Sequence, residues 1–512
     1  MDEEVATQMD WSPFSHQTLL DPEARALSRV GVIDVGSNSV RMVVFDGAAR
    51  APAYFYNEKV MCALGAGLSS SGILNPDGRI RAKAAIIRFV KLAGGMKVTP
   101  LLAVATAAVR EATDGPAFCE EIEAETGLKL WVIDGEQEAR FSAQGVLLGW
   151  PGAEGLMCDI GGSSMEIAEI QDGEVGRCAT SSLGPLKLAD VKGGKKGLRD
   201  HVRSELAQLA KTVPVRHKRL YLVGGSWRAF ARLDMLRKGY PLAVLHEYEM
   251  SPKSIRATID WIETQDLNDL RLQTGIGQAR ISLIPKAIQV LRPLLATFKP
   301  SAVAVSSFGI REGVLYEQMS DRLRRRDPLI EASRFAEARS ARMPGFGKVL
   351  FEFISPLYKG ARESERRLVR AACHLHDVGW RAHPDYRSEV VFDTATQANL
   401  AGMTHEERIF LGLSLLHRYK NSRAGSRFEP FFNMITPEEQ IRAEVLGKAL
   451  RFGAMFAAED GEFLGKLKWF PKKKILEVHM RKDLAILLGE VAQARFNSLA
   501  KSLEAQSRVV MR

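Results

Sequence analysis

Cysteine is scarce in this sequence, and its spacing is typical of neither a disulfide framework nor a metal site. The chain of 512 residues contains five cysteines, and no two of them form a CxxC pair. Most lie in apolar stretches, where reduced core thiols are common. The sequence therefore predicts no disulfide-stapled fold and no cysteine-based zinc site. The five are Cys62, Cys119, Cys158, Cys178 and Cys373.

Long apolar runs are also missing. The sequence has no run of about 18 apolar residues, the length that spans a bilayer as a helix, and no basic-then-apolar leader. Its apolar content of 46% and charged content of 26% are those of an ordinary soluble protein. We therefore expect a cytoplasmic protein without a membrane partner.

The chain lacks a recognisable nucleic-acid module, although it is basic. Its formal charge is +10 and its pI is about 9.3. No aromatic residues are interleaved with the basic runs at 322–326 and 472–474, which favours solvated faces over a nucleic-acid surface. The charge still favours an acidic partner, and we expect a polyanion other than nucleic acid.

Strand-like and helical patterns divide the chain into segments. Strand-like runs are expected at 31–35, 40–46, 100–105 and 129–133, with helices around 79–94 and from near Gly135. A strand, a glycine turn and a helix follow one another at 219–233 and again at 301–319. From 328 onward helical patterns dominate, with one strand candidate at 475–479. We predict, in order, a loose tail (1–28), an α/β domain (29–150), a second α/β domain (151–322), a mainly helical region (323–470) and a small strand–helix segment (471–512).

Both α/β domains open on the same motif. Residues 31–47 read GVIDVGSNSVRMVVFDG, and residues 155–173 read GLMCDIGGSSMEIAEIQDG. In each copy an apolar strand delivers an Asp to a Gly/Ser turn, and a second strand leaves it as in a hairpin. Glycines let backbone N–H groups converge on an anion, and serine hydroxyls add donors, so two facing loops suit phosphate. The alignment sets Asp34 over Asp159, Gly36 over Gly161 and Ser39 over Ser164.

Glu166 is the unusual residue of the second copy, because the first copy has Arg41 at that position. One interpretation places Glu166 on the wet face of a half-buried strand, whose other face is apolar. The other gives this carboxylate a role beside a bound phosphate.

Further motifs carry a resemblance to a known family. "IDVGSNSVRMVV", "ATAAVREA", "DGEQEARFSAQGV", "DIGGSSMEI", "SSLGPLKL" and "FGIREGVLY" occur in the order and spacing of the exopolyphosphatase and guanosine pentaphosphate phosphatase (Ppx/GppA) family. The match runs from about residue 30 to 420 and lies within the actin, sugar kinase and Hsp70 superfamily. The resemblance implies two actin-like (ribonuclease H-like) α/β domains facing a cleft, a helical domain after them, and hydrolysis of terminal phosphoanhydrides with a divalent metal.

The resemblance also implies roles for two residues. Glu138, directly before the Ala-Arg of "EQEAR", matches the catalytic glutamate that orients and deprotonates the attacking water. Its alternative is an acid in a first helical turn, favoured there by the helix dipole. Arg110 matches a phosphate clamp, and its alternative is a surface pair with Asp114 four residues on.

Terminal phosphate removal also needs donors for the phosphate oxygens and neutralisation of their charge. Asp159 and Glu166 are expected to be hard oxygen ligands for Mg²⁺ or another divalent cation such as Mn²⁺, and to complete the catalytic set with Glu138 and Arg110. Arg280 and Arg311 match basic positions of the family, or are structural ion-pair partners. The expected phosphate-binding residues are Asn38, Ser39, Arg41, Gly161, Gly162, Ser163, Ser164, Gly224, Gly225 and Ser226.

Two motifs leave alternatives open. "GGSWR" at 224–228 occupies the nucleotide-loop position of the superfamily, or is only a tight turn from strand to helix. "CHLHDVGW" contains the adjacent His376 and Asp377 and resembles the HD phosphohydrolase fold, so we expect an HD-like helical region. Residues 328–360 contain no histidine that could complete such a metal site, which favours histidines that pack and hydrogen-bond between helices.

These observations predict an exopolyphosphatase that releases orthophosphate from the end of inorganic polyphosphate. The nearest alternative is a guanosine pentaphosphate (pppGpp) 5′-phosphohydrolase, which needs the same core. An alternative of another class is a non-catalytic polyphosphate- or nucleotide-binding regulator. The expected partners are therefore polyphosphate or pppGpp as substrate, without nucleic acid, and a second copy in a homodimer.

Overall fold

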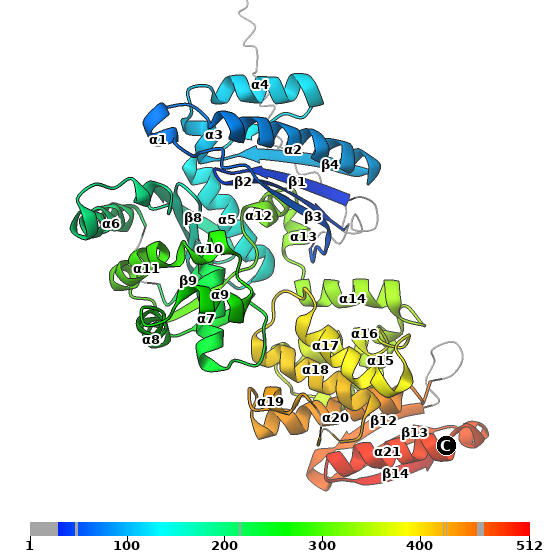
Figure 1. Ribbon diagram of the computed structural model, residues 1–512. Helices are drawn as coiled ribbons and strands as arrows, with labels where there is room; N and C mark the ends of the chain where they lie inside the picture. Colours follow the sequence, from blue (N-terminus) through cyan, green and yellow to red (C-terminus); the bar gives the residue numbers. More distant parts are fainter. Residues whose placement is uncertain (1–28, 47–49, 214–216, 423, 426, 458–464) are drawn as a thin grey trace, which may run out of the picture. The chain divides into compact units, whose positions relative to one another are not determined.

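The computed structural model of the protein describes residues 29–46, 50–213, 217–422, 424–425, 427–457 and 465–512 (Figure 1). The loose tail predicted over residues 1–28 lies outside the described residues. The chain divides into two compact units. The first holds the residues up to Tyr240 together with Leu245–Arg326, and the second holds Pro241–Val244 with Asp327–Arg512.

The first sheet of the first unit has five strands in the order β3-β2-β1-β4-β5. β1 is antiparallel to β2 and parallel to β4, and the buried aliphatic residues of these strands face a core with α2 and α4. Figure 1 shows both helices on one side of this sheet. The elements are β1 (Arg29–Val35), β2 (Ser39–Phe45), β3 (Tyr54–Met61), β4 (Val98–Ala105), β5 (Trp131–Val132), α1 (Leu68–Ser71), α2 (Pro76–Gly95), α3 (Ala107–Glu111) and α4 (Gly115–Thr126).

The second sheet has six strands in the order β10-β11-β9-β6-β7-β8. Its apolar core gathers residues from β6, β9 and β11 and from the helices around them. The two predicted strand–turn–helix segments are confirmed as β9 followed by α7 and β11 followed by α12. The strands are β6 (Gly155–Ile160), β7 (Met165–Gln171), β8 (Glu174–Ser181), β9 (Arg219–Val223), β10 (Tyr248–Met250) and β11 (Ala302–Val305). The helices are α5 (Gly135–Gly149), α6 (Gly194–Thr212), α7 (Gly225–Lys238), α8 (Pro252–Ile262), α9 (Leu267–Thr274), α10 (Gln278–Ile281), α11 (Ile284–Phe298), α12 (Ile310–Glu317) and α13 (Asp321–Arg324).

By length and composition alone, one helical stretch of the described residues, Gln278–Phe298, is apolar enough to cross a membrane. Half of it is buried inside the unit. Its α11 part contributes Ile288, Leu291 and Phe298 to the core under the second sheet and packs against α6, α7 and α8. This stretch is therefore a core helix of the α/β fold.

Helices α5 and α12 cross at very close range, and Figure 1 shows them side by side. A Cβ atom at Gly145 would lie 2.2 Å from the carbonyl oxygen of Gly309, and one at Gly313 would lie 1.7 Å from that of Phe141. Only glycine allows such an approach at these positions. The crossing therefore fixes α5, which begins at an Asp134–Gln137 capping box, against the segment that enters α12.

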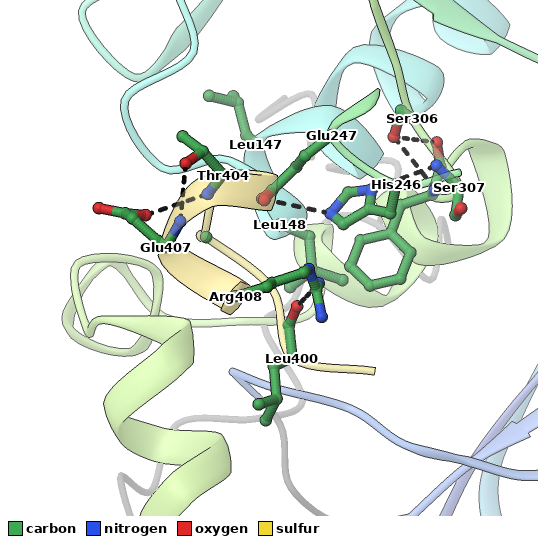
Figure 2. A network of polar contacts seen from close by, with 12 residues as sticks. Leu147, Leu148, His246, Glu247, Ser306, Ser307, Leu400, Thr404, Glu407 and Arg408 are labelled. Carbon is green, nitrogen blue, oxygen red and sulfur yellow. Dashed lines mark hydrogen bonds and ion pairs between the residues drawn. The ribbon is translucent and has the colours of Figure 1, made fainter. Parts of the chain in front are cut away.

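That segment, residues 306–309, is held by a polar network shown in Figure 2. The Ser306 hydroxyl donates to the carbonyl oxygen of Phe308 and accepts from the Phe308 N–H. The N–H of Ser307 donates to Nδ1 of His246 at 3.2 Å, and Glu247 lies on the other side of that ring. The N–H of Ser306 also donates to the carbonyl oxygen of Leu222 in β9 at 2.9 Å, so both this network and the second sheet hold the loop before α12.

The second unit is mainly helical and ends in a small sheet of the order β12-β13-β14. The strand expected at 475–479 is confirmed as β13 (Ile475–Met480), and two strands that the sequence did not predict, β12 (Gly465–Phe470) and β14 (Gln506–Met511), pair with it. Both are edge strands in which lysine, arginine or glutamine dilutes the apolar alternation. The helices are α14 (Pro328–Ser340), α15 (Phe346–Ile354), α16 (Glu363–Leu375), α17 (Arg387–Gln397), α18 (His405–Tyr419), α19 (Glu429–Phe432), α20 (Pro437–Gly453) and α21 (Glu490–Ser502).

Candidate active site

A cleft of about 590 Å³ in the first unit is lined by residues from the strands of both sheets and from the segments that come after those strands. Three carboxylates named from the sequence, Glu138, Asp159 and Glu166, line it. The predicted phosphate-binding residues also line it, namely Asn38, Ser39, Arg41, Gly161, Gly162, Ser163, Ser164, Gly224, Gly225 and Ser226. The tertiary structure therefore brings together residues that lie up to 188 positions apart in the chain.

The repeated motif forms two equivalent hairpins. In β1–β2 the N–H of Gly36 donates to the carbonyl oxygen of Ser39 at 3.1 Å, and in β6–β7 the N–H of Gly161 donates to that of Ser164 at 2.9 Å. The hydroxyl of Ser163 also donates to the hydroxyl of Ser37 at 2.9 Å, which joins the two turns. The two loops therefore face each other across the cleft.

Register explains the exchange of Arg41 for Glu166. Asp34 is the cross-strand partner of Arg41 in the first hairpin, and Asp159 is the partner of Glu166 in the second. Cross-strand partners project from the same face of a sheet. The second hairpin therefore presents two carboxylates side by side, whereas Asp34 in the first forms an ion pair of 3.0 Å with Arg311.

Glu166 is only 1% exposed, so its interpretation as a residue on the wet face of a strand is wrong. Its pKa is raised well above the ordinary value, first by burial and then by the charges of Glu138 and Asp159. Burial also raises the pKa of Asp159, although a hydrogen bond from Ser142 and the charge of Arg228 oppose this. The negative charge of these carboxylates is therefore costly unless a cation joins them.

Glu138 lies in the first turn of α5 with its side chain directed into the cleft, at 9% exposure. Burial raises its pKa to about 8, helped by Asp159 and Asp34 and opposed by Arg110. A carboxyl group with a pKa near neutrality is suited to general acid–base chemistry at physiological pH. Its neighbour Glu136, equally close to the helix start, is exposed.

Arg110 is not among the residues that line the cleft. Its Nη1 donates to the carbonyl oxygen of Ile133 at 2.7 Å and lies 3.4 Å from Oε2 of Glu138. The surface pair with Asp114 is not formed, because Asp114 instead accepts from Arg79 at 3.0 Å. Arg110 therefore touches the site through Glu138.

Five cations line the cleft, and sequence reasoning had left two of them out. Lys59 comes from β3, a strand that was not predicted, and it is the register partner of Arg41. Arg228, four residues after Gly224, has its pKa lowered to about 10 by burial and by the charges of Arg311 and Arg280. Residues four positions apart lie on the same face of a helix, so the position of Arg228, four residues after Gly224, was the available signal in the sequence. The five are Arg41, Lys59, Arg228, Arg280 and Arg311.

Two hydroxyls that the sequence did not reveal contact the paired carboxylates. The Ser142 hydroxyl donates to Oδ2 of Asp159 at 2.6 Å, and the Thr180 hydroxyl donates to Oε1 of Glu166 at 3.1 Å. Ser142 follows Glu138 by four residues on α5, which is the spacing of one helix face. That spacing was the available signal for Ser142.

The "GGSWR" turn contributes both to the cleft and to the core. Gly224 has a φ of +108°, and a Cβ atom there would lie 2.8 Å from Oδ1 of Asp159. Gly225 and Ser226 line the cleft, whereas Trp227 is fully buried in the core of the second sheet. The glycines are therefore needed for close approach to Asp159, and the tryptophan is a packing residue.

In the second unit, His376 and Asp377 each have a structural partner. Nδ1 of His376 hydrogen-bonds the carbonyl oxygen of Cys373 at 2.8 Å, and burial lowers its pKa to about 4. Asp377 accepts from Nη2 and Nε of Arg342 at 2.6 and 2.9 Å. His374 likewise lies 2.5 Å from Glu337. These contacts agree with the helix-packing interpretation of the motif.

Comparison with known proteins adds independent evidence. Residues 43–322 match the model of the Ppx/GppA phosphatase family, and residues 331–510 match that of the exopolyphosphatase C-terminal domain. Exopolyphosphatase 1 of Mycobacterium tuberculosis (strain ATCC 25618 / H37Rv) is 27% identical over 304 residues, which cover 57% of this chain and 88% of that protein. The guanosine-5′-triphosphate,3′-diphosphate pyrophosphatase of Aeromonas hydrophila is 24% identical over 443 residues, which cover 82% of this chain and 86% of that protein.

A solved structure shares the fold of the first unit. The crystal structure of an exopolyphosphatase from Cytophaga hutchinsonii has a TM-score of 0.50 and 23% sequence identity, and the similarity covers 56% of this chain and 97% of that one. The family model spans more than half of the sequence and includes the whole second hairpin together with Glu138, Asp159 and Glu166. The chain belongs to the Ppx/GppA phosphatase family.

Proposed function

We propose that this protein is an exopolyphosphatase, which uses water to release orthophosphate from the end of inorganic polyphosphate. The observation that carries the proposal is the cleft itself. Three carboxylates, of which Glu138 and Glu166 are buried, line the site together with two glycine–serine loops and five cations. Such a site can orient water at one end of a polyanion and neutralise the rest of it.

Glu138 is proposed as the general base. Its pKa of about 8 lies close to the working pH, where a base combines sufficient ionisation with sufficient proton affinity. Arg110 is proposed to hold the Glu138 carboxylate through its ion pair, and the carbonyl oxygen of Ile133 in turn fixes Arg110. Arg110 then acts on the terminal phosphate only through Glu138 unless the cleft closes further.

The two loops are proposed to hold the terminal phosphate. Their backbone N–H groups and the side chains of Asn38, Ser39 and Ser164 supply donors. Arg41 and Lys59, whose pKa values are lowered by burial and by neighbouring cations, would be relieved by an anion that binds between them. A chain of phosphates satisfies this requirement better than a single phosphate does.

A divalent cation, Mg²⁺ or Mn²⁺, fits the carboxylate pair. Asp159 and Glu166 are adjacent on one sheet face. Burial raises the pKa of both carboxyl groups, and the charges of Glu138 and Asp159 raise that of Glu166 further, which is an environment that a cation relieves. Among the described residues no three His, Cys, Asp or Glu side chains form a complete cation cage. Magnesium typically uses one or two carboxylates together with substrate phosphates and water, so two ligands suffice. When bound, the cation would neutralise charge on the transferred phosphate.

Hydrolysis of pppGpp is the second candidate. A relative named for a guanosine-5′-triphosphate,3′-diphosphate substrate aligns over 82% of this chain, and the same loops and carboxylates would serve both substrates. A non-catalytic regulator is disfavoured because Glu138, Asp159 and Glu166 are all retained. Phosphate release from long polyphosphate and from pppGpp, measured side by side with and without magnesium, tests all three. Release from neither substrate at any metal concentration would overturn the catalytic proposal.

The remaining expectations stay predictions. They are the HD-like character of the helical region, the homodimer, the cytoplasmic location and the domain limits at 150, 322 and 470. Light scattering of the purified chain tests the homodimer, and limited proteolysis tests the domain limits.

A further inference from the structure

Both carboxylates of the Asp159–Glu166 pair have hydroxyl partners, and Glu166 has Ser164 as a partner in addition to Thr180. Ser142 on α5 donates to Oδ2 of Asp159 at 2.6 Å, and Thr180 on β8 donates to Oε1 of Glu166 at 3.1 Å. Neither residue lines the cleft described above. Both therefore contact the carboxylates from outside the cleft lining.

Ser142 is held in a rigid place. It is fully buried, and it lies between Phe141, whose carbonyl oxygen meets Gly313, and Gly145, which meets Gly309. These are the two close contacts of the α5–α12 crossing. Because α5 cannot slide against α12, the Ser142 hydroxyl has a fixed position relative to the end of β6 that carries Asp159.

Thr180 is tied to the start of the same helix. A Cβ atom at Gly135, the first residue of α5, would lie 2.4 Å from Cγ2 of Thr180. Thr180 is also the register partner of Glu166 in the β7–β8 pairing, so its side chain lies on the same sheet face. A single helix thus positions Glu138 directly, Asp159 through Ser142, and Glu166 through its contact with Thr180.

A carboxylate has two oxygens, and a hydrogen bond to one of them decides where the other points. At Asp159 the second oxygen, Oδ1, lies on the side of Gly224, which lines the cleft. Around bound metals, partners of this kind fix the orientation of the ligating carboxylates, and their removal costs about 10- to 100-fold in metal affinity.

We propose that Ser142 and Thr180 are positioning residues that orient the carboxylates of Asp159 and Glu166 toward one divalent cation. Ser142 contributes more than Thr180, because its hydrogen bond is shorter and its side chain is fully buried, whereas Thr180 is exposed. The inference rests on the proposed function for the identity of the cation. It concerns cation binding, which is measured without turnover.

The test uses Mn²⁺ as a paramagnetic probe and the full-length chain. The loss of the free Mn²⁺ electron paramagnetic resonance signal gives a dissociation constant for wild type, Asp159→Asn, Ser142→Ala, Thr180→Val and Thr180→Ser. Thr180→Val keeps the shape of the side chain and removes the hydroxyl, whereas Thr180→Ser keeps the hydroxyl. Ser414→Ala in the second unit, whose buried hydroxyl donates to the carbonyl oxygen of Phe410, controls for loss of any buried hydroxyl.

We expect Asp159→Asn to abolish the site, Ser142→Ala to weaken it about 10-fold or more and Thr180→Val to weaken it about threefold. Thr180→Ser and Ser414→Ala should bind as wild type does. If Ser142→Ala and Thr180→Val both bind Mn²⁺ with wild-type affinity, the inference is wrong. It is also wrong if Asp159→Asn binds Mn²⁺ as tightly as the wild type does. If Ser142→Ala does not melt cooperatively, the comparison of Thr180→Val with Thr180→Ser tests the inference. Thr180 is exposed, so its substitution is expected to leave the fold intact.

The proposed function can fail separately. A protein that binds Mn²⁺ in the expected order but releases no phosphate from polyphosphate or pppGpp retains the positioning inference and loses the enzymatic proposal. A protein that hydrolyses polyphosphate with unchanged cation binding in the hydroxyl variants retains the function and loses the inference.

Discussion

The hydroxyl of Ser163 donates a hydrogen bond of 2.9 Å to the hydroxyl of Ser37, so the turns of the two repeated hairpins touch. Both side chains are buried, at 6% exposure each, and both line the cleft. The contact sets the spacing between the two loops that are proposed to hold a terminal phosphate.

Removing this contact should weaken substrate binding and leave the chemical step largely intact. We expect Ser37→Ala and Ser163→Ala each to raise KM for polyphosphate about fivefold, equivalent to about 1 kcal/mol for one neutral hydrogen bond. The double variant should cost little more than either single one, because both remove the same bond. Steady-state kinetics of the three variants measure this coupling. Fully additive effects on KM would show that the Ser37–Ser163 hydrogen bond does not contribute to substrate binding.

Glu138→Gln should lower kcat at least about 100-fold while polyphosphate still binds, since the amide cannot accept the proton of the attacking water. The matched control is Glu136→Gln. Glu136 lies in the same first turn of α5 and interacts with the same helix dipole, but it is exposed. Turnover and a polyphosphate-binding isotherm for each variant distinguish a general base from an acid that only interacts with the helix dipole. If both variants retain wild-type turnover, Glu138 is not the base.

Asp159→Asn and Glu166→Gln should each shift the magnesium dependence to higher concentration by about 10-fold or abolish activity, because each removes an anionic oxygen. Glu169→Gln is the control, as it lies on the same strand β7 but pairs with His217 at 3.4 Å. Magnesium titrations of phosphate release compare the three. Identical titration curves for all of them would remove the metal role from the pair.

The basic C-terminal segment should favour long chains. Residues 465–512 hold 11 lysine and arginine residues against four acids. A variant in which glutamine replaces Lys466, Lys468, Lys472 and Lys473 should bind long-chain polyphosphate with a weaker salt dependence. The slope of log affinity against log salt concentration should fall by about 0.7 for each phosphate that the segment no longer neutralises. Affinity for a short oligophosphate should not change.

The control for this charge variant replaces four exposed lysines of the first unit, Lys91, Lys195, Lys196 and Lys253, so that the net charge is the same. An equal reduction of slope in both variants would show that only the total charge of +10 matters.

Asp377 should stabilise the second unit in a pH-dependent way. Burial alone would raise its pKa, but the hydrogen bonds from the Arg342 side chain and backbone lower it below the ordinary value of about 3.9. Because the pKa is lower in the folded state, the ionised Asp377 carboxylate adds to the free energy of unfolding above about pH 4. This stabilisation is lost as the pH falls through the folded-state pKa. Asp377→Asn should therefore cost about 1 kcal/mol at pH 7, a small value because Arg342 is half exposed, and less in acid.

Urea unfolding of wild type and Asp377→Asn at pH 7 and pH 3 measures this difference. A free-energy difference that does not shrink in acid would mean that the ionised carboxylate is not the stabilising form. Polyphosphate hydrolysis should be unchanged in this variant at pH 7, as expected for a helix-packing pair.

The local elements were accessible from the sequence wherever short-range rules decide them. The repeated apolar–Asp–Gly–Ser pattern predicted β1–β2 and β6–β7, and the helix predicted from near Gly135 is α5. The strands that were missed all lie at the edges of their sheets, where a weak apolar alternation suffices and neighbouring strands decide the pairing; they are β3, β8, β10, β12 and β14. Lys59 was missed with β3 for the same reason.

By itself the sequence determined that the chain carries two phosphate-type hairpins, that Glu138, Asp159 and Glu166 are their accompanying acids, and that the chain resembles the Ppx/GppA family. The repeated pattern along two strands is enough to locate the hairpins with Asp159 and Glu166, whereas the choice of Glu138 rests on the family resemblance. Only the tertiary structure decided that Arg110 contacts Glu138, that Trp227 is a core residue, and that Ser142 and Thr180 contact the paired carboxylates. These relationships depend on how helices cross and how strands pair across long stretches of chain, which local patterns do not encode.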